Sequence, residues 1–143
     1  MKIGELARLA NCTADTVRFY EKEGLLPRAD RTEANYRTYN EGHIERLRFI
    51  RNCRALDMAH EEVRALLHAA DGYSSSCGTV NSLVDEHIQH VNVRIEELTQ
   101  LRHQLTALRQ KCEGEHPIED CGIMHELSSR EATQPRSKAS HLG

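Results

Sequence analysis

The chain has 143 residues, of which 38% are hydrophobic and 29% charged, so it can form one domain, or a small domain plus an extended element, around a modest core. No apolar run approaches the roughly 20 residues that span a bilayer, and residues 1–12 lack a secretion signal, which favours a soluble, cytoplasmic protein with no membrane partner. Residues 1–54 carry 11 Lys and Arg against 8 Asp and Glu, whereas residues 55–143 carry 8 against 14, so only the first third is suited to face a polyanion.

Two short helices joined by a tight turn are predicted first. Apolar residues recur at helical spacing in IGELARLA, residues 3–10. The second helix, within ADTVRFYEKEGLL, has Thr13 as its expected N-cap, and Gly24 and Pro27 mark its end. This order is the helix-turn-helix pattern, which many small helical bundles share.

A hairpin and two further helices are predicted next. Residues 28–39 break the helical period and end in the alternating NYRTY, which indicates a small hairpin or wing. Asn40 is expected to cap a third helix over residues 41–56, and a fourth is predicted over residues 57–70. The stretch DGYSSSCG, residues 71–78, interrupts the pattern and predicts a linker.

The longest predicted helix covers residues 79–112. Its apolar residues step by four and three from Val84 to Leu98, as in a coiled coil, and after a three-residue slip the seam continues from Leu101 to Cys112. At 1.5 Å per residue this helix would be about 50 Å long. A single helix cannot bury its own narrow apolar stripe, so we expect a second copy of the chain to cover it. The stripe could instead fold back on its own domain, which the short linker disfavours.

The order of these elements resembles a known family. The stretches IGELARLANCTADTVRFYEKEGLLP, NYRTY and IERLRFIRNCRALDM, followed by the long helix, resemble the MerR family of bacterial transcription regulators over residues 1 to about 126. Within the family, CRALDM, SCGTVN and LVDEHIQHV are most similar to the cadmium- and lead-responsive branch. The resemblance implies a mainly α fold: a winged helix-turn-helix DNA-binding domain (1–70), a linker with Cys77 (71–79), an antiparallel coiled coil for dimerisation (80–112), and a metal-binding loop with a short terminal helix (113–127). Residues 128–143 are polar and aperiodic, which predicts a disordered tail.

Arginine and tyrosine side chains on the second helix, the wing and the third helix are the candidate DNA contacts, because arginine binds phosphates and guanine edges and tyrosine binds phosphates. The candidates are Thr16, Arg18, Tyr20, Arg31, Tyr36, Arg37 and Arg54. Arg18, Tyr36 and Arg37 match family positions that contact DNA. The resemblance implies a homodimer on a palindromic operator in an over-long promoter spacer, which represses without metal and activates RNA polymerase by distorting the DNA when metal binds.

Five widely spaced cysteines argue against a disulfide framework. Cys53 and Cys12 are expected to be structural. Cys77 precedes the long helix and Cys112 ends its seam, so in an antiparallel pair Cys77 of one subunit would meet Cys112 and Cys121 of the other. These three cysteines stand at the family's metal-binding positions, and the predicted site would exist only in the dimer.

Three thiolates favour soft or borderline ions over magnesium or calcium. Cd(II) and Pb(II) are the favoured inducers on the resemblance, and Hg(II) or Zn(II) is the alternative because the cysteine spacing also resembles the mercury regulators. A fourth ligand could come from His116, Glu113, Asp120 or water.

Three other interpretations of the sequence have less support. His87 and His90 stand at i, i+3 in DEHIQH, which allows a weaker second metal site, although a solvated or seam-flanking pair is the simpler interpretation. A zinc–thiolate enzyme would need a general base and a substrate pocket, which the sequence does not suggest. A coiled-coil DNA-binding protein with a structural zinc, and no metal switching, is the distant alternative.

Overall fold

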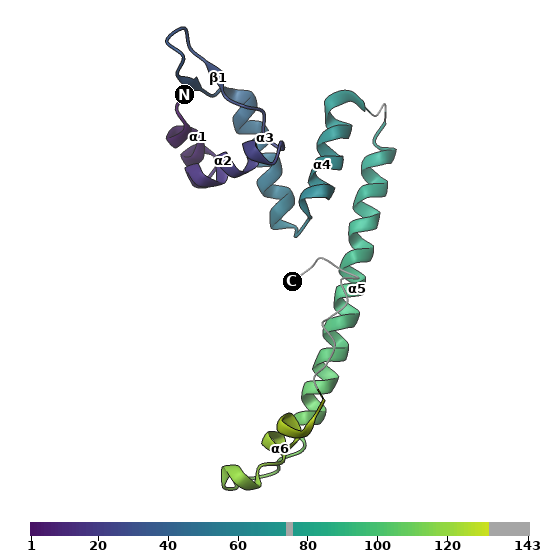
Figure 1. Ribbon diagram of the computed structural model, residues 1–143. Coiled ribbons are helices and arrows are strands. Elements are labelled where there is room, and N and C mark those ends of the chain that lie inside the picture. The colour runs from purple at the N-terminus through teal and green to yellow at the C-terminus, as the bar shows by residue number, and fades with distance from the viewer. Residues whose placement is uncertain (74–75, 132–143) are drawn as a thin grey trace. The chain divides into compact units, whose positions relative to one another are not determined.

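The computed structural model describes residues 1–73 and 76–131 (Figure 1). The chain divides into two compact units, Met1–Asp85 and Glu86–Gly143. The fold is mainly helical in both, as the sequence predicts. Among the described residues, no helix has the length and apolar character needed to cross a membrane.

The first unit opens with the predicted helix-turn-helix. Helix α1 (Ile3–Leu9) is followed by α2 (Ala14–Lys22), and the hydroxyl of Thr13 accepts a hydrogen bond of 3.1 Å from the backbone N–H of Thr16. This bond satisfies one of the free donors at the start of α2 and confirms Thr13 as its N-cap. Asn11 turns the chain between the helices with a φ of 56°, and Gly24 follows α2 with a φ of 75°.

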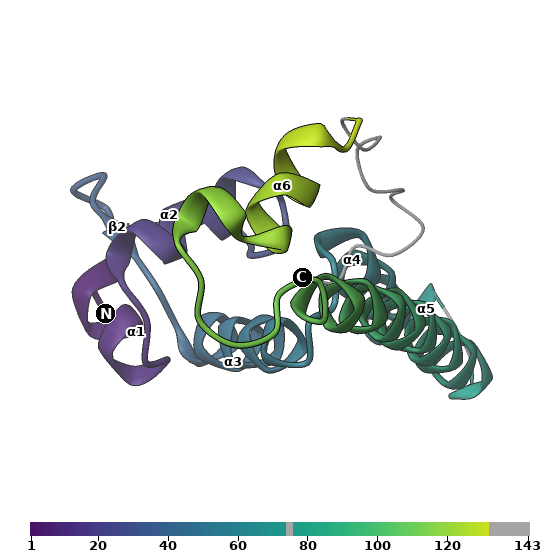
Figure 2. The same ribbon diagram turned by 90° about the horizontal axis from the view of Figure 1, so that it is seen from below.

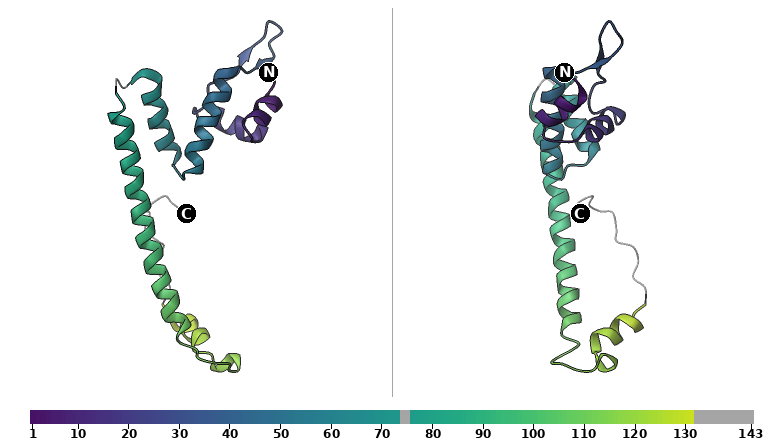
Figure 3. Two further views of the ribbon diagram at one scale, coloured as in Figure 1. Left: turned by 180° about the vertical axis from the view of Figure 1, so that it is seen from behind. Right: turned by 90° about the vertical axis from the view of Figure 1, so that its left-hand side faces the viewer.

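A short hairpin forms the predicted wing. Strands β1 (Asp30–Arg31) and β2 (Arg37–Thr38) pair antiparallel, with Asp30 opposite Thr38 and Arg31 opposite Arg37. The turn between them is closed by a bond of 2.8 Å from the N–H of Thr32 to the carbonyl of Tyr36. Figure 3 shows the hairpin projecting from the first unit beside the start of α1.

Helices α3 (Glu41–Ala55) and α4 (His60–His68) complete the helical part of this unit. Asn40 caps α3 as expected, because its side-chain oxygen accepts a hydrogen bond from the His43 N–H. In turn, Nδ1 of His43 accepts a hydrogen bond from the Asn40 N–H, and the two bonds make a capping box. Helix α4 begins later than predicted, because Asp57 has a φ of 60° and Glu62 accepts a hydrogen bond from the N–H of Ala59 at its start. The helix ends in a π-helical turn, η1 (Ala69–Tyr73), in which Gly72 has a φ of 92°.

The core of the first unit draws on all four helices and on the segment after α2. Leu6, Val17, Leu47, Ile50 and Val63 are fully buried. Val80 and Leu83, in the first turns of the next helix, pack against this cluster. These contiguous buried side chains give the first unit a hydrophobic core of its own.

Helix α5 (Gly78–Arg109) runs without interruption for 32 residues. It ends three residues before Cys112, so the prediction of helix up to Cys112 was too long. The side chain of Arg109 donates to the Cys112 carbonyl at 2.8 Å, and Gly114 turns the chain with a φ of 76°. Most of the predicted seam is exposed in the single chain: Val84, Ile88, Ile95, Leu98, Leu101 and Leu105 are between 38% and 56% exposed, whereas Val91 and Leu108 are partly buried.

After α5 the chain forms a loop, a short 3-10 turn η2 (Ile118–Asp120) and helix α6 (Gly122–Ser129), which Figure 2 shows following one another. Helix α6 extends two residues beyond the expected end of the terminal helix at 127. Residues 132–143, most of the predicted disordered tail, lie outside the described residues.

Candidate nucleic-acid interface and thiol site

A basic hollow of about 550 Å³ lies between α2 and the hairpin of the first unit. Its lining residues are Arg18, Glu21, Lys22, Arg28, Ala29, Arg31 and Arg37. Five cationic side chains from α2, both strands of the hairpin and the loop between α2 and β1 thus converge, with one carboxylate among them. Such a surface suits the phosphate backbone of a nucleic acid.

Three predicted DNA contacts, Arg18, Arg31 and Arg37, meet in this hollow. A fourth, Tyr36, is 73% exposed and shares a neighbouring hollow with Arg18 and Arg37. The guanidinium of Arg18 forms an exposed ion pair of 2.9 Å with Asp15. Exposed pairs of this kind contribute little to stability, so Arg18 can exchange Asp15 for a phosphate at small cost.

Two cationic residues of the hollow, Lys22 and Arg28, were not predicted. Lys22 stands four residues after Arg18 on the same helix, so helical periodicity could have identified it. Arg28 lies between α2 and β1, where no periodic signal exists, and only the fold brings it to the hollow.

The remaining predicted contacts lie elsewhere. The structure argues against Tyr20, which is only 7% exposed and packs its ring against Phe19 and His60 at centroid distances of 5.4 and 6.1 Å. Tyr20 is shielded from DNA because it lies on the side of α2 that faces the core. Arg54 donates to the Met58 carbonyl after α3, and the Thr16 hydroxyl lies 2.9 Å from that of Thr13.

In the second unit, Cys112 and Cys121 are brought together by the loop after α5. Cys121 is the N-cap residue of α6, and the backbone N–H of Met124 lowers the pKa of its thiol, with a smaller contribution from Cys112. The interaction with Cys121, together with burial, raises the pKa of the Cys112 thiol. The start of α6 therefore stabilises a thiolate at Cys121, which is the protonation state that a soft metal ion requires.

Gly122 closes this loop by close packing. A Cβ atom at this position would overlap the carbonyl oxygen of Lys111, the residue before Cys112. Gly114 turns the loop after Cys112 with a left-handed backbone. The need for a glycine at position 122 was not predicted from the sequence, because it depends on a contact with Lys111, eleven positions earlier in the chain.

The remaining cysteines lie outside the thiol loop, and His116, a candidate fourth ligand, lies within it. Cys77 is exposed, directly before α5. Cys53 is buried, which confirms its structural role and raises the pKa of its thiol, and Cys12 packs at the edge of the same core. His116 donates from Nε2 to the Glu113 carbonyl at 2.6 Å, within the loop.

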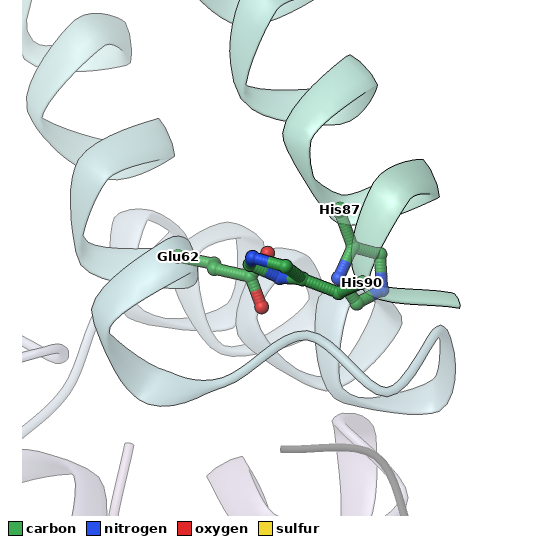
Figure 4. Close-up of side chains that lie close together, drawn as sticks. All are labelled: Glu62, His87 and His90. Carbon is green, nitrogen blue, oxygen red and sulfur yellow. The ribbon is translucent and has the colours of Figure 1, made fainter. Parts of the chain in front are cut away.

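His87 and His90 lie on the same side of α5, with ring centroids 6.2 Å apart and planes nearly perpendicular (Figure 4). His87 is buried and His90 is partly buried. The predicted i, i+3 arrangement is therefore present on the helix.

These features define a class: a DNA-binding protein with a winged helix-turn-helix, followed by a long helix with an unburied seam and a thiol loop. Residues 1–70 match the family described as "MerR HTH family regulatory protein", and residues 44–108 match the one described as "MerR, DNA binding". The chain belongs to the MerR family of helix-turn-helix transcription regulators.

Individual relatives agree with this assignment. The chain is 45% identical over 111 residues to the HTH-type transcriptional regulator ZntR homolog of Haemophilus influenzae, covering 78% of this chain and 82% of that one. It is similar to the crystal structure of the transcription regulator PbrR691 from Ralstonia metallidurans CH34 in complex with lead(II), with 48% identity, a TM-score of 0.81, and coverage of 89% and 98%. A more distant relative, the mercuric resistance operon regulatory protein of Bacillus cereus, is 30% identical over 129 residues, covering 90% and 98%. These relatives are regulators and not enzymes.

Proposed function

We propose that the protein is a homodimeric, metal-responsive transcription regulator of the cytoplasm. Cys77 of one chain and Cys112 and Cys121 of its partner hold a soft metal ion, and the state of this site controls how the DNA-binding units act on a promoter. The observation that carries the proposal is the thiol pair of Cys112 and Cys121 at the start of α6.

The donor set fits a soft ion. The two thiols lie close enough for each to shift the pKa of the other, and the N-terminal turn of α6 favours the anionic form of Cys121. Two thiolates at one point attract thiophilic ions and offer little to magnesium or calcium.

The third thiolate is best supplied by a second chain. The continuous helix α5 separates Cys77 from Cys112 along the chain, and 32 residues of helix measure about 48 Å. An antiparallel pair of these helices would place the start of one beside the end of the other. The exposed seam of α5 is the surface through which such a pair would form.

Cd(II) and Pb(II) are the favoured inducers. The similarity to the lead-bound regulator PbrR691 extends over 89% of the chain at 48% identity. Hg(II) or Zn(II) is the alternative, and the mercuric resistance regulator among the relatives supports keeping Hg(II). His87 and His90, on one side of α5, are proposed as donors to a second and weaker site.

On DNA, the dimer would place two basic hollows on the half-sites of a palindromic operator. We propose that Arg18, Tyr36 and Arg37 make the principal contacts, with Arg31 beside them. The operator lies in an over-long promoter spacer, where the apo dimer represses and the metal-bound dimer distorts the DNA so that RNA polymerase can engage. Bending a site of this length costs about 1–6 kcal/mol, which protein contacts can supply.

The test is a titration of the reduced dimer with Cd(II), Pb(II), Hg(II) and Zn(II), followed through the ultraviolet thiolate-to-metal bands. Wild type is compared with Cys77→Ser, Cys112→Ser and Cys121→Ser, and Cys53→Ser serves as the control outside the site. We expect each of the first three changes to abolish the bands, and the wild-type affinities to rank the inducers.

Two results would contradict the proposal. Bands that survive in Cys77→Ser would show that the linker thiol takes no part. Operator binding and transcription that are unchanged by every metal would favour a structural-zinc protein without switching, even if the thiols bind the ion.

A further inference from the structure

One side-chain hydrogen bond joins the two elements that we propose to contact DNA. The hydroxyl of Tyr39, directly after β2, donates to Oε1 of Glu21 on α2 at 2.5 Å. The two residues are 18 positions apart, and Tyr39 is only 3% exposed. The bond therefore connects the end of the hairpin to α2 from inside the first unit.

Both partners stand next to candidate DNA contacts. Glu21 follows Arg18 by three residues, so the two share a face of α2, and both line the basic hollow. Tyr39 follows Arg37 by two residues in extended chain. Tyr39 itself lines the neighbouring hollow, together with Arg18 and Arg37, so the bond joins the edges of the two hollows beside these arginines.

A carboxylate in a basic, DNA-facing hollow calls for an explanation, because Glu21 repels phosphate. We propose that Glu21 and Tyr39 are positioning residues, which hold the hairpin at a fixed distance from α2 so that Arg37 and Arg18 meet the operator in register. This inference rests on the proposed function, in that α2 and the hairpin are taken as the DNA contacts. Because the Glu21 carboxylate repels phosphate, it also weakens binding to DNA whose phosphates and bases do not line up with Arg18 and Arg37.

The bond is maintained at neutral pH. Burial and the bond to Glu21 raise the pKa of Tyr39 to about 12, so its hydroxyl remains a donor at neutral pH. The position of the backbone does not depend on the hydroxyl alone, since the Tyr39 N–H donates to the Met1 carbonyl at 2.8 Å and its ring packs against His43. Removing the hydroxyl should therefore leave the first unit folded.

The experiment measures DNA affinity by fluorescence anisotropy with two duplexes of equal length. One is the palindromic sequence that the wild-type protein selects from a random pool, and the other is its scrambled version. The variants are Tyr39→Phe, Glu21→Ala, Glu21→Gln and the double variant Tyr39→Phe with Glu21→Ala. Tyr20→Phe, the same chemical change at a buried tyrosine of α2, is the matched control.

Tyr39→Phe is expected to weaken binding to the selected duplex about tenfold, the usual scale for a hydrogen bond to a charged group, and to change scrambled binding less than twofold. Glu21→Gln keeps an acceptor and should retain most of the preference for the selected duplex. The double variant should bind the selected duplex no more weakly than Glu21→Ala alone, because the bond is already absent. Tyr20→Phe should leave the ratio of the two affinities unchanged.

The inference is overturned if Tyr39→Phe binds both duplexes as wild type does, or if it weakens both equally. It is also overturned if the effects of Tyr39→Phe and Glu21→Ala simply multiply in the double variant. A wild-type protein that selects no sequence from the pool would contradict the proposed function instead, so the two failures are distinguishable.

Discussion

The two units of this chain use their apolar residues in opposite ways. In Met1–Asp85, residues from every helix are fully buried, including Leu6, Leu47 and Val63. In the described part of the second unit, residues 86–131, no apolar side chain is buried, and its leucines form a stripe along α5. The first unit buries its own hydrophobic surface, whereas the described part of the second leaves an apolar stripe exposed along α5, which we propose a second chain covers. The comparison indicates that the first unit can fold on its own core whatever covers the stripe of the second.

The largest expected effect is on the core of the first unit. Leu47→Ala removes a fully buried side chain and should lower the free energy of unfolding by about 2–5 kcal/mol. Leu56→Ala is the matched control, because Leu56 is 65% exposed, and it should change stability by less than about 0.5 kcal/mol. Thermal unfolding followed by circular dichroism measures both, and equal effects would show that the core is not where we place it.

The apolar stripe of α5 should respond through assembly. Leu101→Glu places a charge at the centre of the stripe in both chains and should weaken dimerisation by on the order of 100-fold. Ala107→Glu adds the same charge to the opposite side of the helix and should leave the dimer intact. Analytical ultracentrifugation distinguishes the two, and a Leu101→Glu chain that remains dimeric would exclude the stripe as the interface.

The thiol loop should depend on the small size of Gly122. A methyl group there would overlap the Lys111 carbonyl, so Gly122→Ala should displace Cys121 from Cys112 and weaken metal binding about tenfold. Gly4→Ala is the control, because no atom lies within 4 Å of a Cβ at that position. Unchanged ultraviolet bands in a Gly122→Ala titration would show that the loop opens freely.

The two thiols of the loop should differ in reactivity. The lowered pKa of Cys121 gives it a larger thiolate fraction near pH 7 than Cys112, whose pKa is raised, and only the thiolate is nucleophilic. Iodoacetamide should therefore modify Cys121 severalfold faster, and lowering the pH should slow Cys112 first. Mass spectrometry of the digested protein provides the rates, and faster modification of Cys112 would reverse the assignment.

The smallest effect is expected where the first unit meets its linker. Arg46 on α3 pairs with Asp71 in η1 at 2.7 Å, and the Asp71 side chain is 47% exposed. Asp71→Asn should therefore cost only about 0.2–1 kcal/mol of stability. A double-mutant cycle with Arg46→Gln measures the coupling, and a larger value would show that η1 belongs to the rigid core.

Local patterns in the sequence were sufficient for much of the fold. Thr13 and Asn40 could be identified as caps because a capping side chain acts on residues within one turn. The seam of α5 could be read because its period is independent of what covers it. The end of α5 was misplaced, since the apolar period continues through Cys112 after the helix has stopped.

The sites were less predictable where they depend on distant residues. Arg18 and Arg37 could be named from residue type and position in the motif. Arg28 and the Glu21–Tyr39 bond could not, because they are brought together only by the packing of the hairpin on α2. The burial of Tyr20 could not be predicted, because an amphipathic helix presents tyrosine equally well to solvent or to a core, and here its ring packs beside Phe19 and His60.

The central claim is that the metal site is shared between two chains, and mixed dimers test it most directly. Cys77→Ser and Cys112→Ser proteins are titrated with Cd(II) or Pb(II) separately, and then after they have been mixed, unfolded and refolded together. Neither variant alone should show thiolate-to-metal bands, and the mixture should regain about a quarter of the wild-type intensity, because half of its dimers contain one intact site. A mixture that stays silent while wild type binds the ion would contradict the shared site.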